Sequence, residues 1–495
     1  MKKPNILLIF TDQQRADTIH ALGNAVIRTP NLDRLYTSGT AFTSAYTPSP
    51  VCVPARCSML YGQYPPQTKC YDNNFPMPVD GRPSFVEILT RAGYRTHGIG
   101  KCHYTPDLHA LRGFQTREKQ EEIVFSPEVD DYLKFLHAAG YGYITDPHGV
   151  RSEMYYIPQI APMPAKFHPA QWVGDRGVAF LESVAHHNQP WYLFLSFIHP
   201  HPPFSPPIPW HKLYRVPEMP LPNLPPHYTA LQTYINRVQN RYKYRDRGLD
   251  FNLIRCIKAY YYATISFVDF QIGRILDTLE KHGMLDRTMI IFTSDHGELL
   301  GDYGCFGKRS MHDACAKVPL LVRFPERFSS GKTCNIPVSL VDVAPTVLNS
   351  ADIHFDAYRL DGIDLAEVAN NASKRRFVFM QYQNRGNAIY TIITEKWKYA
   401  YSAPDNKEFL FDRSADPLET KNLARVNSCN GIKQQLKRDL IEYLSSTGEI
   451  DAIDGDDWRI YPQMEIPSDP DAGLIVQEHP WAQVNLPPSY MDKKA

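Results

Sequence analysis

The sequence predicts an α/β fold, in which helices sandwich a large mixed, mostly parallel sheet and a smaller antiparallel sheet with a helix follows. Continuous apolar runs at 6–10, 191–198 and 289–293 are typical of strands covered on both faces of a parallel sheet. At 495 residues the chain is too long for one ordinary core. Near residue 365 short runs joined by tight turns begin to favour an antiparallel sheet. We therefore expect two domains, 1–365 and 366–495.

The composition excludes several classes of partner. Lys+Arg and Asp+Glu each number 53, so no overall field attracts nucleic acid or an anionic membrane. No apolar run reaches the ~18 residues of a membrane-spanning helix, and the run at 5–10 is too short for a signal peptide. We expect no nucleic-acid or membrane partner, and a cytoplasmic protein, or a periplasmic one if a leader has been removed. The nine cysteines form no CxxC pair, which argues against a disulfide framework or a zinc ribbon.

Polar side chains follow the first predicted strands. Asp12 comes just after the run 6–10. Ligands bind at the carboxyl edge of open α/β sheets, so Asp12 is a candidate ligand residue, although an aspartate there is more often a helix cap. The strand predicted over 94–103 carries Lys101 and His103, which the period of two places on one face. Further elements predicted in the first half are helices at 29–35, 84–92 and 172–185 and a strand at 42–47.

The stretch 52–62 reads as a strand end that turns into a helix beginning at Cys52. Unpaired N–H groups and the positive end of the helix dipole suit an anion at such a position. Arg56, one turn further on, adds a fork of donors. The alternative is a buried cysteine beside an exposed arginine.

Two long segments lack a regular period. Residues 105–169 are irregular and aromatic, which is typical of loops that shape a pocket or lid. Residues 205–250 are rich in Pro, Tyr and Arg and form either a substrate-facing excursion or a partner surface. Between them the strand 191–198 ends in His199-Pro200-His201-Pro202, where flanking prolines would present His201 with little entropy to lose.

The second half repeats the layout found at Asp12. The strand 289–293 ends in Asp295-His296, and a glycine-punctuated loop leads to Lys308. The other predicted elements are helices at 254–282 and 341–348, a strand at 318–324, short strands at 377–381, 388–394, 396–401 and 408–412, and an amphipathic helix at 431–446. We expect the tail, 450–495, to wrap over the body or a neighbouring subunit.

Six stretches, in order, resemble the type I sulfatases and the wider alkaline-phosphatase-like fold. They are Asn5 to Gln13, Cys-x-Pro-Ala-Arg with Leu-x-Gly in 52–62, Gly100-Lys101-Cys102-His103, Pro200-His201-Pro202-Pro203-Phe204, Ser294-Asp295-His296-Gly297 with Lys308, and Phe409 through Asp416-Pro417 to Leu423. They span most of residues 4–425. The chain departs from the family at Cys102, where a tryptophan is usual, and at His312, where many members have tyrosine.

The resemblance implies a divalent metal ion at Asp12, Gln13, Asp295 and His296, together with the modified side chain of Cys52. Many members of the family have aspartate in place of Gln13 and asparagine in place of His296. An oxygen-rich site favours calcium, and the imidazole makes manganese the alternative.

The resemblance also implies a nucleophile made from Cys52. In the family this cysteine is oxidised after synthesis to formylglycine, which requires a formylglycine-generating maturation enzyme as a partner. One hydroxyl of the hydrated aldehyde attacks sulfur, and the second lets the sulfated diol collapse and expel sulfate, a route closed to a thiol or to serine.

Five further residues receive catalytic roles from the resemblance. Arg56 and Lys101 would fix the hydrate and neutralise the sulfate, and Lys308 would contact the sulfate from the opposite loop. His201 is the candidate general acid for the departing alcohol. His103 is the candidate that bonds the hydrate and accepts its proton.

These implications predict a sulfuric ester hydrolase whose substrate is a sulfated carbohydrate or another small sulfate ester. A phosphonate monoester or phosphodiester hydrolase is the alternative, since related enzymes combine formylglycine with an Asp, Gln, Asp, His metal set. A third interpretation is a non-catalytic anion-binding member in which Cys52 stays a thiol. A cysteine peptidase has little support, because no order of nucleophile, base and orienting group accompanies Cys52.

Overall fold

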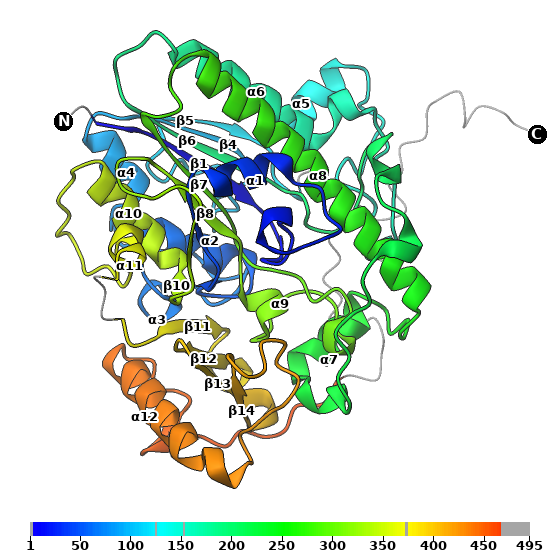
Figure 1. Cartoon of the computed structure of the whole chain (residues 1–495), viewed down its shortest axis with the longest axis vertical. Helices are drawn as coiled ribbons and strands as arrows, with labels where there is room; N and C mark the ends of the chain where they lie inside the picture. The colour runs from blue at the N-terminus through cyan, green and yellow to red at the C-terminus, as the bar shows by residue number, and fades with distance from the viewer. Residues whose placement is uncertain (1–2, 124–125, 152–153, 372–374, 467–495) are drawn as a thin grey trace, which may run out of the picture.

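The larger part of the molecule is built on an eight-stranded sheet (Figure 1). The computed structural model describes residues 3–123, 126–151, 154–371 and 375–466. The order of the strands is β5-β4-β6-β1-β7-β8-β2-β9. Their bounds are β1 Asn5–Thr11, β2 Thr40–Phe42, β4 Arg95–Gly100, β5 Thr116–Lys119, β6 Trp191–Phe197, β7 Thr288–Ser294, β8 Leu320–Arg323 and β9 Lys332–Cys334.

The centre of this sheet is parallel and places several strand ends at one edge. β1 lies between β6 and β7, with Leu8 opposite Phe194 on one side and Ile291 on the other. β8 runs antiparallel to both β7 and β2, so the sheet is mixed but mostly parallel, as predicted. The carboxyl ends of β1, β4, β6 and β7 therefore meet at a single edge.

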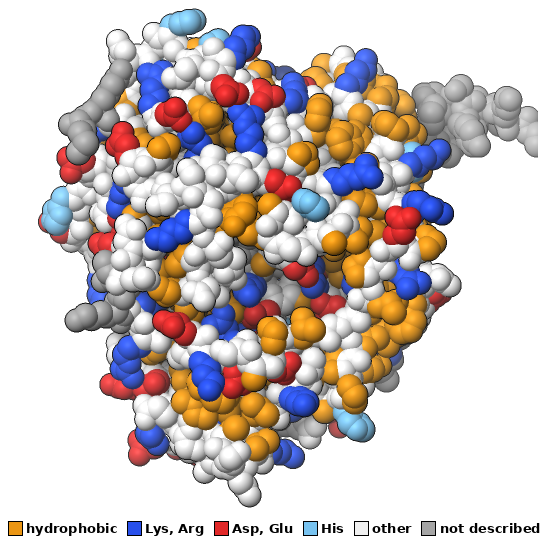
Figure 2. Space-filling model, in the orientation of Figure 1, with side chains coloured by type: hydrophobic (Ala, Val, Ile, Leu, Met, Phe, Trp, Pro, Cys, Tyr) orange, Lys and Arg blue, Asp and Glu red, His pale blue; other side chains and the backbone are white. Residues whose placement is uncertain are grey.

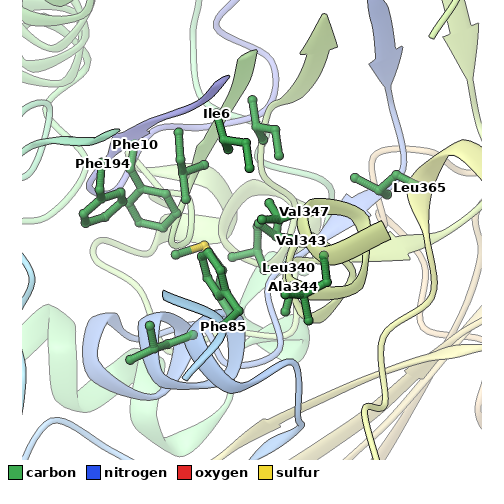
Figure 3. Packing of buried hydrophobic residues seen from close by; sticks show 14 of the residues in the cluster. Ile6, Phe10, Phe85, Phe194, Leu340, Val343, Ala344, Val347 and Leu365 are labelled. Carbon is green, nitrogen blue, oxygen red and sulfur yellow. The ribbon is translucent and has the colours of Figure 1, made fainter. Parts of the chain in front are cut away.

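Helices cover both faces of the sheet, and alternate residues of β1 face the two layers (Figure 1). One face carries α1 Pro30–Thr37, α5 Asp131–Ala138, α6 Pro169–Val184 and α8 Phe251–Lys281. The other carries α2 Cys52–Tyr61, α4 Phe85–Arg91, α10 Val343–Ser350 and α11 Leu365–Ala369. Figure 3 shows the second layer, where Phe10 and Phe194 lie side by side with ring centroids 5.7 Å apart. This packing buries the whole of β1.

A four-stranded antiparallel sheet and a helix make up the smaller C-terminal part, as predicted. The elements are β11 Val378–Tyr382, β12 Ile389–Ile393, β13 Trp397–Ser402, β14 Lys407–Asp412 and α12 Asn430–Ser446. Val378 and Met380 pack against Leu299 and Met311 of the larger part. Because α11 is buried in the core of the large sheet, we propose that the two domains divide between α11 and β11.

Several elements differ from the predictions. The strand expected over 94–103 ends at Gly100, and that over 42–47 is replaced by two short strands, β2 and β3 (Ala45–Tyr46). The segment 205–250 contains a helix, α7 (Tyr234–Tyr242), which was missed. The buried residues of α7, Asn236 and Gln239, are polar: Asn236 forms a capping box with Thr233, and Gln239 donates to the carbonyl of Lys308, so an apolar pattern does not mark the buried side of this helix.

The remaining short elements are α3 Pro65–Thr68, α9 Asp313–Ala316, β10 Val338–Ser339, which pairs with β3, and the hairpin of β15 Ile453–Asp454 and β16 Asp457–Trp458. Most of the tail expected to wrap over the body, from 467 on, lies outside the described residues. Within the described ranges, no helix combines the length and apolar character needed to cross a bilayer. Figure 2 shows both signs of charge mixed over one face of the molecule, with acidic and basic side chains inside a hollow near its middle.

Candidate active site

Three elements bring the predicted metal ligands together at the carboxyl edge of the large sheet. Asp12 and Gln13 follow β1, Asp295 and His296 follow its neighbour β7, and Cys52 is the first residue of α2. The ligand atoms of Asp12, Cys52, Asp295 and His296 lie within 4.8 Å of one another, and all four residues are buried. Residues far apart in the chain meet here because β1 and β7 are adjacent parallel strands.

The donor atoms of this cluster fit a divalent cation. Oε1 of Gln13 is buried and has no hydrogen-bond partner in the described part of the chain, while its Nε2 donates to the Glu298 carboxylate. Burial and the charge of Asp12 raise the pKa of Asp295 to about 6. Two carboxylates that oppose each other's ionisation, an unpartnered amide oxygen and an imidazole form a set that a metal ion would satisfy.

Arg56 is buried rather than exposed, and it holds the two carboxylates. Its Nε donates to Asp295 at 3.0 Å, and one Nη donates to Asp12 at 3.1 Å. The other Nη donates to the carbonyl of Lys101 at 2.7 Å and to Ser196 at 3.1 Å. Burial opposes the charge of Arg56, but Asp295 and Asp12 raise its pKa above the usual value. The guanidinium thus orients the candidate metal ligands.

Two lysines supply positive charge around Cys52. Nζ of Lys308 lies 2.8 Å from Sγ of Cys52, and Nζ of Lys101 donates to Asp12 at 2.7 Å and also to Glu122. Burial acts to raise the pKa of the Cys52 thiol, but the charges of Lys308, Lys101 and His296 bring it well below its usual value. The position therefore stabilises an anion, as its place at the start of α2 also favours.

His201 faces Lys308 across the site. Its Nδ1 lies 2.7 Å from the carbonyl oxygen of Pro202 and 3.2 Å from the Glu122 carboxylate, so Nδ1 carries the proton. Nε2 then accepts a hydrogen bond from Nζ of Lys308, at 3.0 Å. Burial lowers the pKa of His201 to about 4, so at neutral pH the imidazole is uncharged and the nearby proton belongs to Lys308.

His103 reaches the site from a loop, not from the face of a strand. β4 has already ended at Gly100, and His103 has a left-handed backbone with φ of 54°. Its backbone N–H donates to Glu121 at 3.2 Å, and its Nδ1 is buried without a hydrogen-bond partner among the described residues. The period-two argument that paired it with Lys101 was wrong, although both residues lie at the site.

A cavity of about 630 Å³, its open mouth included, leads to these groups. It is lined by Gln13, Asp72, Asn73, Asn74, His103, Glu122, Tyr155, Tyr156, His201, Gln239, Lys243, Gly307, Lys308 and Arg309. The expectation that the segment 105–169 shapes a pocket is confirmed, because Glu122, Tyr155 and Tyr156 line the cavity. The sequence did not single out the other wall residues Asp72, Asn73, Asn74, Gln239, Lys243 and Arg309. Glu298 was also missed, although it comes two residues after His296 and could have been noticed there.

Comparisons with known proteins agree with this geometry. The family model described as Sulfatase matches residues 4–353, and one described as N-sulphoglucosamine sulphohydrolase, C-terminal, matches residues 301–446. An arylsulfatase of Clostridium perfringens is 29% identical over 90% of this chain and 95% of its own length. A choline-sulfatase of Rhizobium meliloti is 32% identical over 85% of this chain and 82% of its own length.

Solved structures share the fold of this chain. The solved structure of a phosphonate monoester hydrolase of Agrobacterium radiobacter superposes with a TM-score of 0.78, at 23% identity, over 91% of this chain and 98% of that one. This likeness concerns the fold, which the two enzymes share. The family match and the relatives are more specific, and the chain belongs to the sulfatase family.

Proposed function

We propose that this protein hydrolyses sulfate esters with a formylglycine made from Cys52 and a divalent metal ion held by Asp12, Gln13, Asp295 and His296. The observation that carries the proposal is the placement of Cys52 at the start of α2, with Lys308 at 2.8 Å and the carboxylate cluster beside it. When present, the hydrated formylglycine supplies a hydroxyl for attack on sulfur and another for release of sulfate, and the metal ion supplies positive charge.

The lysines of the site would bind the sulfate of the substrate. Lys308 already faces the position of the nucleophile, and Lys101 is held beside Asp12. Both are buried, where a charge-assisted hydrogen bond to an anion is stronger than in water. Arg56 acts on the same site indirectly by fixing both carboxylates. We assign His103, whose Nδ1 lacks a partner in the described chain, to accept a proton from the nucleophile.

Proton donation to the leaving alcohol is assigned to His201 together with Lys308. His201 alone is neutral at pH 7, because its pKa lies at about 4. Nε2 of His201 nevertheless accepts a hydrogen bond from the Lys308 ammonium at 3.0 Å, so the pair holds a proton inside the cavity. Burial opposes the charge of Lys308, but Cys52 and Asp12 raise the pKa of its ammonium above the usual value, so this proton is present at neutral pH. Pro202 and Glu122 fix the ring through Nδ1. The role predicted for His201 is therefore proposed here for the pair.

The metal ion is proposed to be calcium, with manganese as the alternative. Three of the four side chains offer oxygen, which suits calcium, whereas the imidazole of His296 suits manganese. Metal analysis of the purified protein, followed by removal and replacement of each ion, distinguishes them. The ion that restores activity at the lower concentration is the functional one.

The substrate is proposed to be a sulfated carbohydrate or another small sulfate ester. The cavity wall offers amide side chains, from Asn73 and Asn74, of the kind that hydrogen-bond sugar hydroxyls. The second family description, which names a sulphohydrolase of an amino sugar, agrees with this class. A phosphonate monoester or phosphodiester hydrolase is the second candidate, favoured by the structural likeness to such an enzyme.

Two measurements test the proposal. Mass analysis of the peptide containing Cys52, from protein made with its maturation enzyme, should find the lighter aldehyde in place of the thiol. Rates on an aryl sulfate and on phenyl phosphonate, measured side by side, should favour the sulfate. A larger rate on the phosphonate would select the alternative, and an unmodified thiol in protein from its native host would indicate a non-catalytic anion-binding member.

A further inference from the structure

Lys243 is a charged residue of the cavity for which the proposed reaction has no use. It is the C-cap residue that follows α7, and its Nζ lies 4.7 Å from the ring centroid of Tyr155. No carboxylate forms an ion pair with Lys243 within the described ranges of the chain. Its main interaction is thus with an aromatic face, which leaves its donors available to a ligand.

The acidic side chains of the cavity are already committed to other cations. Asp72 pairs with Arg309 at 3.4 Å and accepts a hydrogen bond from Gln383 at 2.7 Å. Glu122 pairs with Lys101 and Arg151 and lies 3.2 Å from His201. Both carboxylates are therefore already paired with cations other than Lys243.

The surroundings of Lys243 are strongly positive. Burial, followed by the charges of Arg309, Arg151 and Lys308, lowers the pKa of Lys243 to about 7, and Glu122 opposes this effect. Lys243 is half-buried, and an ammonium group that has lost part of its water beside other cations is costly unless an anion accompanies it. Lys308 has such a partner in the nucleophile and the scissile sulfate. Lys243 lines the same cavity, so an anion at Lys243 would belong to the rest of the substrate.

We propose that Lys243 forms a second anion subsite, so that the preferred substrate is a sulfate ester whose alcohol part carries a further anionic group, a carboxylate or another sulfate. This inference rests on the proposed sulfatase function and adds the class of its substrate. It also predicts discrimination against alcohols with a quaternary ammonium group, because Lys243 would repel them and the described carboxylates of the cavity, Asp72 and Glu122, are already paired with other cations.

Matched aromatic sulfates test the subsite. The 2-, 3- and 4-sulfooxybenzoates are each compared with their methyl esters, which differ only in the charge of the carboxyl group. Benzene-1,3-diyl disulfate against phenyl sulfate tests a second sulfate in the same way. For the best isomer, the wild-type kcat/KM should be about 10- to 100-fold higher for the charged compound than for its uncharged counterpart. This is the effect expected of one hydrogen bond to a charged group.

The preference should depend on Lys243 and not on lysines in general. K243M should abolish it while leaving kcat/KM on the methyl ester within about threefold, and K243R should retain most of it. K166M is the matched control, because Lys166 also lies over an aromatic ring, Phe167, at 4.6 Å but is exposed and outside the cavity. Turnover of the methyl ester also shows that each variant is folded.

Binding measurements separate this inference from the proposed function. The sulfobenzoates and their methyl esters carry a carbon–sulfur bond that the enzyme cannot hydrolyse, and calorimetry gives their affinities directly. Tighter binding of a carboxylate form, lost in K243M, supports the subsite even if no sulfate ester is turned over. Equal binding of charged and methylated forms by the wild type, or a preference that K243M retains, overturns it.

Discussion

Glu298 is expected to set the orientation of Gln13, and replacement by glutamine tests this. The Glu298 side chain is fully buried and accepts from Nε2 of Gln13, from the hydroxyl of Tyr156 at 2.8 Å, and from the N–H groups of Gly307 at 2.6 Å and Leu300 at 3.1 Å. A carboxylate only accepts, so Gln13 must present Nε2 to it. Oε1 of Gln13 is thereby left for the metal ion.

E298Q replaces one of the two carboxylate oxygens of Glu298, both of which accept hydrogen bonds, with an NH₂ group. If this group faces Gly307 and Leu300, two buried N–H groups lose their acceptor, at about 1–3 kcal/mol each. If it faces Gln13, the Gln13 amide is free to turn and present Nε2 to the metal. Loss of a group that orients a ligand typically lowers metal affinity about 10- to 100-fold. The second arrangement costs less stability, so we expect weaker metal binding with unfolding free energy lowered by about 1–3 kcal/mol.

Calorimetric titration of metal-free protein with calcium and with manganese measures the affinity, and thermal unfolding without metal measures the stability. Y156F is the matched control, because it removes one donor to the same oxygen and leaves the bond to Gln13 intact. Y156F should bind metal as the wild type does. Wild-type metal affinity in an E298Q protein that is clearly destabilised would refute the reasoning, since Glu298 would then only anchor its loop.

Three further predictions follow from the geometry. H201A should lower kcat by about 10²- to 10⁴-fold on esters with poor leaving groups and far less on activated aryl sulfates, and equal losses on both would contradict proton donation. R56M should lower the free energy of unfolding by about 3–5 kcal/mol in chemical denaturation, because it leaves Asp12 and Asp295 without their shared partner; added metal should recover part of this loss. Burial raises the pKa of Asp130 to about 7, so the folded state holds this proton more tightly than the unfolded state. The resulting stability is present at low pH and is lost as the pH rises through about 7. Between pH 5 and 7 the wild type should therefore lose up to about 1.4 kcal/mol per pH unit relative to D130N, and parallel curves would exclude this titration.

Local pattern was sufficient for the elements that hold the nucleophile and the metal ligands. Apolar runs predicted β1, β6 and β7, and the turn chemistry before Cys52 predicted the start of α2. The carboxyl-edge rule marked Asp12 as a candidate ligand residue, and the resemblance to the sulfatases joined it with Asp295 in one metal site. The antiparallel character after residue 377 was equally visible, because short alternating runs and tight turns are local features.

The wall of the cavity could not be predicted in this way. Lys243 follows α7, whose buried residues are polar, and its position depends on contacts of α7 with the loop of Lys308. Glu122 contacts Lys101, His201 and Arg151, and Glu298 accepts a hydrogen bond from Gln13, which lies 285 residues earlier in the chain. Strand and helix periods report which side of an element is buried, whereas the partner of a buried charge depends on loop paths through space. The sequence thus predicts the residues of the nucleophile and the candidate metal site, whereas the residues that would select the substrate are brought together only by the folded chain.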